Sequence, residues 1–166
     1  PEVRFINQYF EEDLFIKAIA NSIKKAENEH GKPQKIVFSY HGIPKKYLLE
    51  GDPYHCFCLK TTRLVREHLN YKEEDVMTTF QSRFGSQEWL QPYTDETLKK
   101  LPNEGIKNIH IISPGFSSDC LETLEELKEE NKEYFMEAGG TSYEYIPCLN
   151  DNLDHITMMK HLIRNH

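Results

Sequence analysis

The chain has 166 residues, of which 38% are hydrophobic and 28% charged, a composition typical of one soluble globular domain. No apolar run reaches the roughly 18 residues that a membrane-spanning helix needs, and the first residues do not resemble a signal peptide. The formal net charge of −7 disfavours a nucleic-acid partner, since such proteins usually present a basic face. We therefore expect a single domain at 1–166 that resides in the cytoplasm.

Short apolar segments alternate with amphipathic ones along the chain. β-Branched and aromatic clusters predict strands, and apolar residues at three- and four-residue spacing predict helices. In chain order the expected elements are an extended segment at 3–6, a helix at 10–26, a strand at 35–40, a helix at 55–69, a strand at 76–81, a helix at 95–101, a strand at 106–113, a helix at 121–138, a strand at 143–146 and a helix at 153–163. This alternation indicates an α/β fold, with a parallel sheet of about four strands and helices on both faces.

The helix expected at 121–138 carries many carboxylates. Its inward face is expected to consist of Leu121, Leu124, Leu127 and Phe135. Glu122, Glu126 and Glu130 recur at four-residue intervals and would form one line along an α-helix. Such a row could relay cations or protons, although a charge run this broad is more often a solvated face, so both interpretations stay open.

Two residues fall where parallel sheets bind ligands, at the carboxyl ends of the strands. His41 follows the strand at 35–40 and could act as a base or a metal ligand, or simply bond a loop carbonyl. Glu122 opens the long helix, where a catalytic carboxylate would sit. Asp119 lies three residues earlier, so the pair could equally be a helix-capping arrangement.

Other candidate residues are less specific. Trp89 is the only tryptophan and could pack against a planar ligand or cover a core. Cys56 and Cys58 are separated by one residue, whereas structural zinc sites usually space cysteines by two to four. We interpret these and the other two cysteines, Cys120 and Cys148, as reduced thiols. No nucleotide-binding or classical hydrolase motif is present.

Five ordered blocks nevertheless carry a specific resemblance. They are Ser-Tyr-His-Gly-Ile-Pro at 39–44, Gly-Asp-Pro-Tyr at 51–54, Thr-Phe-Gln-Ser-Arg-Phe-Gly at 79–85, Trp-Leu-Gln-Pro-Tyr-Thr-Asp-Glu at 89–96 and Pro-Gly-Phe-Ser-Ser-Asp-Cys-Leu-Glu-Thr-Leu-Glu-Glu at 114–126. Together they resemble the ferrochelatases, whose members insert ferrous iron into protoporphyrin IX to form protoheme, the last step of heme biosynthesis. The resemblance implies a lyase with a Rossmann-like lobe, no tightly bound cofactor, and ferrous iron as a substrate.

The resemblance also implies roles for residues. His41 would be the main proton acceptor or metal ligand, and Glu122 its partner across the ring. Glu126 and Glu130 match the family's acidic row and would bind the metal on its way in. Imidazole and carboxylate suit a transient ferrous ion, whereas a thiolate would hold it too tightly. Three residues would bind the porphyrin: Ser39, Tyr40 and Trp89.

Two features depart from the family pattern. Cys120 stands where many members carry a histidine, and the four cysteines do not match an iron–sulfur cluster pattern, so we expect no cluster. Family members are also longer, so the chain would be the carboxyl-terminal catalytic lobe without its amino-terminal lobe. Expected partners are protoporphyrin IX, ferrous iron and that lobe, with peripheral membrane contact left open. The alternatives are a cobalt or sirohydrochlorin chelatase, a metal- or tetrapyrrole-binding module without turnover, and a non-enzymatic interaction domain.

Overall fold

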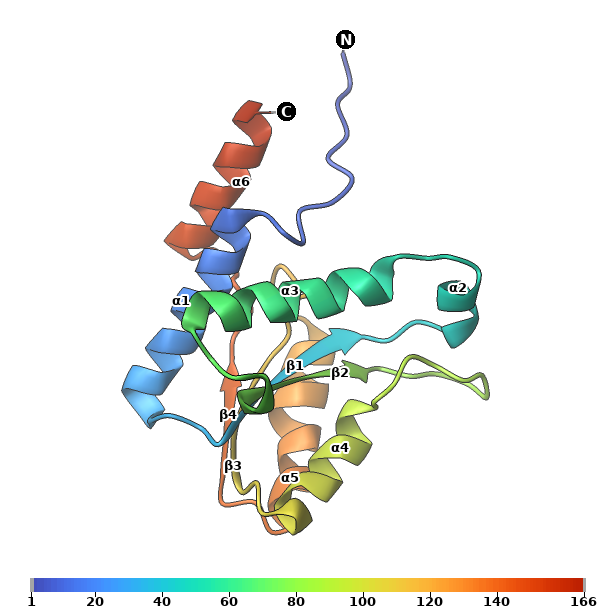
Figure 1. Cartoon of the computed structure of the whole chain (residues 1–166), viewed down its shortest axis with the longest axis vertical. Helices are drawn as coiled ribbons and strands as arrows, with labels where there is room; N and C mark the ends of the chain where they lie inside the picture. The colour runs from blue at the N-terminus through green and yellow to red at the C-terminus, as the bar shows by residue number, and fades with distance from the viewer. Residues whose placement is uncertain (1, 166) are drawn as a thin grey trace.

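The computed structural model describes residues 2–165, with a four-stranded sheet at its centre (Figure 1). All neighbouring strands are parallel, and their order is β2-β1-β3-β4. The strands are β1 (Lys35–His41), β2 (Val76–Gln81), β3 (Asn108–Ile112) and β4 (Ser142–Ile146). Each lies close to its sequence-predicted bounds, which confirms the α/β fold with a parallel sheet.

Helices cover both faces of this sheet (Figure 1). The α-helices are α1 (Asp13–His30), α2 (Lys45–Leu49), α3 (Tyr54–Leu69), α4 (Thr94–Lys100), α5 (Asn131–Glu137) and α6 (Leu153–Asn165). Two short 3₁₀ helices are η1 (Glu73–Asp75) and η2 (Leu101–Glu104). α1 packs against α3 and α6 on one face, and α4 packs against α5 on the other. No helix within residues 2–165 is long and apolar enough to cross a membrane.

Strand alternation divides the core into two clusters. Ile36 and Phe38 of β1 join the cluster under α1, α3 and α6. Val37 points the other way and joins Ile109 and Ile111 in the cluster under α4 and α5. Because both faces are covered, the central strands β1 and β3 carry apolar residues on both faces, as is usual for parallel sheets.

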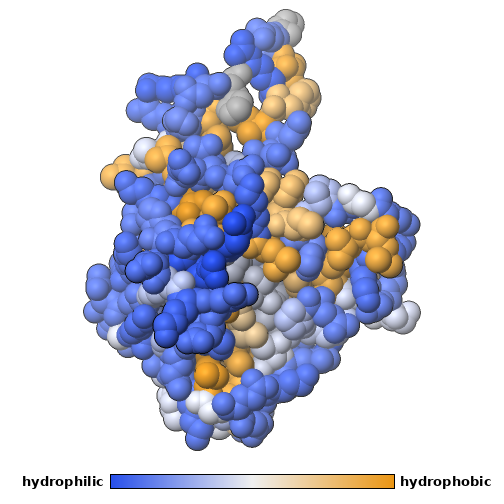
Figure 2. All heavy atoms as spheres, viewed as in Figure 1, coloured by the Kyte–Doolittle hydropathy of each residue, from blue (hydrophilic) through white to orange (hydrophobic). Residues whose placement is uncertain are grey.

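The amino-terminal segment differs from the expectation. Residues 3–6 belong to no strand, and Val3 and Phe5 are 70% and 80% exposed. The first helix begins and ends later than predicted, at Asp13–His30. Figure 2 shows apolar side chains gathered on the surface at this segment and over α2.

A further difference lies in the long helix. Glu122–Glu130 is a π-helix, η3, and only the part after it, α5, is α-helical. Because a π-helix bonds residues five apart, its turn is wider than that of an α-helix. The inward row therefore follows four-residue steps and consists of Thr123, Leu127 and Asn131. The prediction of an inward Leu121 and Leu124 is wrong, since these side chains are 70% and 44% exposed, while Leu127 and Phe135 are buried as expected.

Side-chain donors bond carbonyl groups of the π-helix, in addition to its own main-chain hydrogen bonds. Three carbonyls accept such bonds: Glu122 O from Gln81 Nε2 at 2.8 Å, Glu126 O from Asn131 Nδ2 at 2.7 Å, and Leu127 O from Tyr143 OH at 2.5 Å. Two of the donors come from the strands β2 and β4. The sheet therefore holds η3 through its two outer strands, from Gln81 at the end of β2 and from Tyr143 near the start of β4.

Candidate functional site

His41 is the last residue of β1, and its ring is fixed by a neighbouring carbonyl. Nδ1 lies 2.7 Å from Gly42 O. Because a carbonyl only accepts hydrogen bonds, Nδ1 carries the proton, and Nε2 keeps a lone pair while the ring is neutral. The Tyr54 hydroxyl donates to the His41 carbonyl at 2.8 Å, which fixes the backbone as well. This is the arrangement that a base or metal ligand requires.

The backbone at this point requires a glycine. A Cβ on Gly42 would lie 3.0 Å from Gln81 O and 3.2 Å from Trp89 Cε3. The Gly42 amide also donates to Gln81 O at 2.8 Å. The chain after β1 therefore lies directly against β2 and the indole.

Aromatic rings from two loops neighbour the imidazole. The ring centroids of Trp89 and Phe116 lie 6.4 and 6.2 Å from that of His41, at interplanar angles of 52° and 57°. The indole Nε1–H donates to Phe84 O at 2.9 Å, which orients the Trp89 ring. Such faces suit contact with a flat apolar ligand. Phe116 was not singled out from the sequence, although it lies in the block at 114–126.

Glu122 is the first residue of η3 and lies within electrostatic reach of His41. Its own backbone N–H and the Cys120 thiol lower the pKa of the Glu122 carboxyl, and positive charge on His41 lowers it further. The carboxylate is therefore ionised at neutral pH. The tertiary structure brings together the two residues that the sequence placed 81 positions apart.

Asp119 does not form the helix-capping pair with Glu122 that its position suggested. Burial opposes its ionisation, but hydrogen bonds from Asn150, Tyr145 and Cys148 outweigh that effect and lower the pKa of Asp119. The Tyr145 hydroxyl and Asn150 Nδ2 donate to its carboxylate at 2.5 and 2.7 Å. Asp119 therefore ties the loop before η3 to the end of β4 and does not engage Glu122.

A buried polar network links the two halves of the site. Ser39 Oγ donates to Gln81 Oε1 at 2.9 Å, and Gln81 Nε2 donates to Glu122 O at 2.8 Å. Ser113 Oγ donates to Ser39 O at 2.6 Å. Gln81 therefore connects the strand that carries His41 to the helix that carries Glu122. The sequence placed Gln81 in the block at 79–85 and at the end of a strand, but gave it no role of its own.

Two of the expected porphyrin contacts lie inside the protein. Ser39 has no exposed surface, and Tyr40 is 3% exposed. The Tyr40 hydroxyl hydrogen-bonds Thr62 Oγ1 at 3.1 Å, and burial raises the pKa of Tyr40. With these side chains packed in the core, neither presents a surface to a ligand, so both support the His41 loop from beneath.

Four of the five glutamates of η3 line a cavity of about 460 Å³ beside β2. Its charged lining residues are Arg83, Asp95, Glu122, Glu125, Glu126 and Glu130. Arg83 is already paired with Asp95 and Glu96, at 3.1 and 2.8 Å. The structure thus brings Glu122, Glu126 and Glu130 to one cavity. Within residues 2–165, however, no three His, Cys, Asp or Glu side chains gather closely enough to hold a metal ion.

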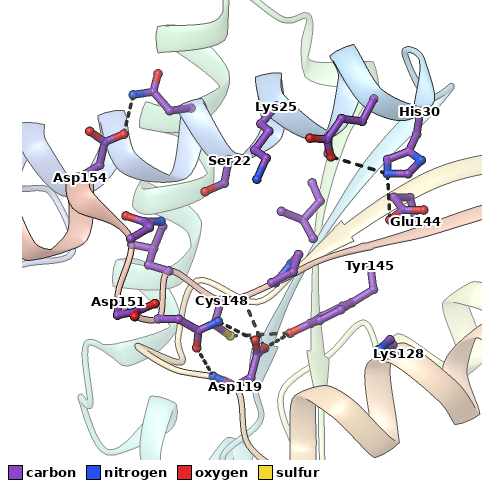
Figure 3. Close-up of a pocket in the computed structure, with 18 of the residues that line it drawn as sticks. Ser22, Lys25, His30, Asp119, Lys128, Glu144, Tyr145, Cys148, Asp151 and Asp154 are labelled. Atoms are coloured by element: carbon purple, nitrogen blue, oxygen red, sulfur yellow. Dashed lines mark hydrogen bonds and ion pairs between the residues drawn. The ribbon is translucent and has the colours of Figure 1, made fainter.

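A larger cavity of about 790 Å³ lies between α1 and the turn from β4 into α6 (Figure 3). Asp119 with its partners forms one wall, and the His30–Glu144 pair, at 3.4 Å, lies on another. Neither His41 nor Glu122 lines this cavity. It is therefore separate from the site at the ends of β1 and β2.

Of the four cysteines, Cys120 alone takes part in the arrangement described around His41 and Glu122. All four are free thiols, as the sequence predicted. Burial raises the pKa of Cys58 and of Cys148 to about 12, so both stay protonated.

Two solved structures share the fold of this chain. One is a putative cobalamin biosynthesis CbiX protein from Marinobacter aquaeolei VT8, with a TM-score of 0.52 and 11% identity over 80% of this chain and 96% of that one. The other is DR2241 from Deinococcus radiodurans, a multi-domain protein similar to chelatases, with a TM-score of 0.56 and 11% identity over 90% of this chain and 28% of that one. At this identity the likeness shows the fold alone.

Sequence comparison is more specific. The chain is 55% identical over 165 residues to a ferrochelatase of Marinobacter nauticus and 56% identical over 165 residues to one of Idiomarina loihiensis, covering 99% of this chain and 45% of each relative. It is 54% identical over 164 residues to ferrochelatase 2 of Shewanella oneidensis, covering 50% of that relative. The chain thus spans about half the length of these relatives. The ferrochelatase family model matches all of residues 1–166, so the chain belongs to the ferrochelatase family.

Proposed function

We propose that the chain is the carboxyl-terminal catalytic lobe of a ferrochelatase. The complete enzyme would insert ferrous iron into protoporphyrin IX and release protoheme, the last step of heme biosynthesis. The observation that carries the proposal is His41, which lies beside the aromatic faces of Trp89 and Phe116, keeps Nε2 unbonded among the described residues, and is close enough to an ionised Glu122 to affect its charge.

The geometry suits the chemistry of metal insertion. Two pyrrole N–H protons leave the macrocycle as one Fe²⁺ enters, so the ring nitrogens lose two protons and gain one metal ion. His41 Nε2 accepts the two pyrrole protons in turn and passes each to solvent as a general base. Glu122 supplies the negative charge that holds the partly desolvated ion, and neither ligand is soft enough to retain it. Trp89 and Phe116 offer apolar faces to the flat ring.

The iron reaches this pair through the cavity beside β2. Glu130 and Glu125 lie along it, and their carboxylates attract divalent cations from solution. Since an ion must be released into the porphyrin, a path of single carboxylates is better suited than a closed binding site.

The rest of the enzyme would complete the cleft. α6 buries one apolar face on α1 and exposes a second one, which consists of Leu153, Ile156, Met159 and Ile163 at 79%, 50%, 38% and 76% exposure. A helix that is apolar on two faces normally lies between two layers. We propose that the amino-terminal lobe, which the longer relatives have room for, packs on this face. The free thiols suit a reducing compartment, so we place the enzyme in the cytoplasm.

Porphyrin absorbance tests the proposal directly. Ferrous iron or zinc is added with protoporphyrin to the complete enzyme, to its His41→Ala variant and to this chain alone. His41→Ala should lower kcat by about 100-fold or more, because a general base is lost. An unimpaired variant would contradict the role of His41. Porphyrin binding without turnover by this chain would identify it as a binding module, and turnover with sirohydrochlorin instead of protoporphyrin would favour the other chelatase class.

A further inference from the structure

Glu126 differs from the other carboxylates of the η3 cavity because both of its oxygens are already bonded. Oε1 accepts the backbone N–H of Ser82 at 2.8 Å, and Oε2 accepts the Ser82 hydroxyl at 2.5 Å. Gln81 Nε2 lies 3.4 Å from the same Oε2. In the described part of the chain, Glu125 and Glu130 have no such side-chain partner. Hydrogen bonds to an ionised carboxylate are about twice as strong as neutral ones.

The backbone of Ser82 is bent to make these bonds. Its φ of +62° lies in the left-handed region, which is unfavourable for residues other than glycine. Such a conformation persists only where the surroundings hold it. At Ser82 it directs the amide and the hydroxyl toward the same carboxylate, so Glu126 is the group that holds it.

Ser82 begins the loop that carries Trp89. The loop runs from the end of β2 to α4, and inside it the Trp89 indole donates to Phe84 O. Its far part is attached to the His41 side of the site, since Leu90 N donates to Ile43 O at 3.0 Å. The start of the loop is attached to η3 through Glu126. A shift of η3 at Glu126 would therefore move Ser82 and, with the loop, the Trp89 indole beside His41.

We propose that Glu126 is a positioning residue that clamps the loop at 82–92 to the π-helix, and that it is not a ligand of the incoming ion. The inference rests on the proposed function only for the identity of the ion. It replaces the metal-binding role that the family resemblance implied for this residue, because a carboxylate with both oxygens bonded to the protein would have to release Ser82 before it could bind a cation.

Two substitutions at Glu126 separate the clamp from a ligand. Glu126→Gln keeps a carbonyl for the Ser82 amide and an amide group for its hydroxyl, but removes the charge that a cation needs. Glu126→Ala removes the clamp as well. Glu125→Ala is the matched control, since Glu125 lies on the same helix and lines the same cavity.

The first measurement uses this chain, without substrate. Glu126→Ala should speed amide hydrogen exchange at Ser82 by about tenfold or more, given the usual strength of a charged hydrogen bond. It should also make Trp89, the sole tryptophan, easier to quench with acrylamide. Glu125→Ala should match the parent chain, and Glu126→Gln, whose neutral hydrogen bonds are weaker, should give a smaller increase than Glu126→Ala. Ser82→Ala, which removes only the hydroxyl, should give a smaller increase in Trp89 quenching and serves if Glu126→Ala does not fold.

The second measurement uses the complete enzyme with zinc as the probe ion. Glu126→Gln should change the KM for zinc by less than about twofold, whereas Glu122→Gln should raise it by about tenfold, the effect of losing roughly 1.4 kcal/mol. An equal rise in both variants, or unaltered Ser82 exchange in Glu126→Ala, would overturn the clamp. The exchange and quenching data need no turnover, so they decide the inference even if the complete enzyme proves not to be a ferrochelatase.

Discussion

The two nitrogens of His41 have different tasks, and the difference comes from one backbone bond. Nδ1 is committed to Gly42 O, so only Nε2 is available for a proton or a metal ion. The sequence had left two interpretations of this histidine, a loop residue bonded to a carbonyl and a functional base. The structure confirms the first interpretation at Nδ1 and leaves Nε2 available, so the second remains a proposal for that nitrogen. The hydrogen bond from Nδ1 to Gly42 O orients the ring and leaves Nε2 available.

Gly42→Ala tests how tightly this loop is held. The new Cβ would press on Gln81 O, a backbone atom of β2 that cannot easily move, and on the Trp89 ring. We expect unfolding to become easier by about 1–3 kcal/mol, the usual cost of overpacking, as measured by urea denaturation of this chain. Gly115→Ala is the control, since its Cβ would meet Tyr40 Cδ1 at an ordinary 3.5 Å. Equal stability of the two variants would contradict the close approach.

At the scale of elements, the π-helix is the main difference between expectation and structure. The apolar pattern at 121–138 indicated one α-helix, and the expected inward row was correct only at Leu127 and Phe135. Local sequence could not show the widened turn, because the groups that support it are distant in sequence. Gln81 and Tyr143 reach η3 from strands on either side. The strands were predicted well because short runs rich in β-branched and aromatic residues carry a strong local signal.

Tyr143→Phe tests the contribution of one such support. The substitution keeps the buried ring and removes only the hydroxyl that donates to Leu127 O. It leaves a buried carbonyl without that donor, so we expect a loss of about 1 kcal/mol or more in the free energy of unfolding. Urea denaturation gives the value, and hydrogen exchange should rise first in η3. The control is Tyr47→Phe, at a side chain 42% exposed. If Tyr143→Phe is as stable as the control, the hydroxyl does not support the π-helix.

For the whole molecule, a buried histidine links stability to pH. His110 of β3 is 1% exposed, and its Nδ1 has no hydrogen-bond partner among the described residues. Burial, together with the nearby charge of His30, lowers the pKa of His110 to about 4. Glu144 is its neighbour in β4 and is paired with His30. Between about pH 4 and pH 6.5 this ring is therefore neutral in the native state and protonated in the unfolded chain.

Stability should consequently fall as the pH drops from about 7 towards 4. In that window the unfolded state binds a proton near the ordinary histidine pKa of about 6.5 and the native state does not, so the slope from this group reaches at most about 1.4 kcal/mol per pH unit. Urea denaturation of this chain at several pH values measures it. His110→Leu should flatten the slope in this window, whereas replacing the exposed His68 by leucine should leave it unchanged. An unaltered slope in His110→Leu would assign the pH dependence to other groups.

The sequence by itself determined the strands, most helices, the parallel α/β class and the family, because these depend on local apolar patterns and on contiguous motif blocks. It also identified His41 and Glu122 as candidates, since His41 directly follows a predicted strand and Glu122 opens a predicted helix. Only the tertiary structure decided which side chains face the site. Helices on both faces of the sheet buried Ser39 and Tyr40, the sheet held η3 in a π-helix, and Ser82 engaged Glu126 across 44 residues of sequence. Those outcomes depend on hydrogen bonds between distant segments, and no pattern within one segment records them.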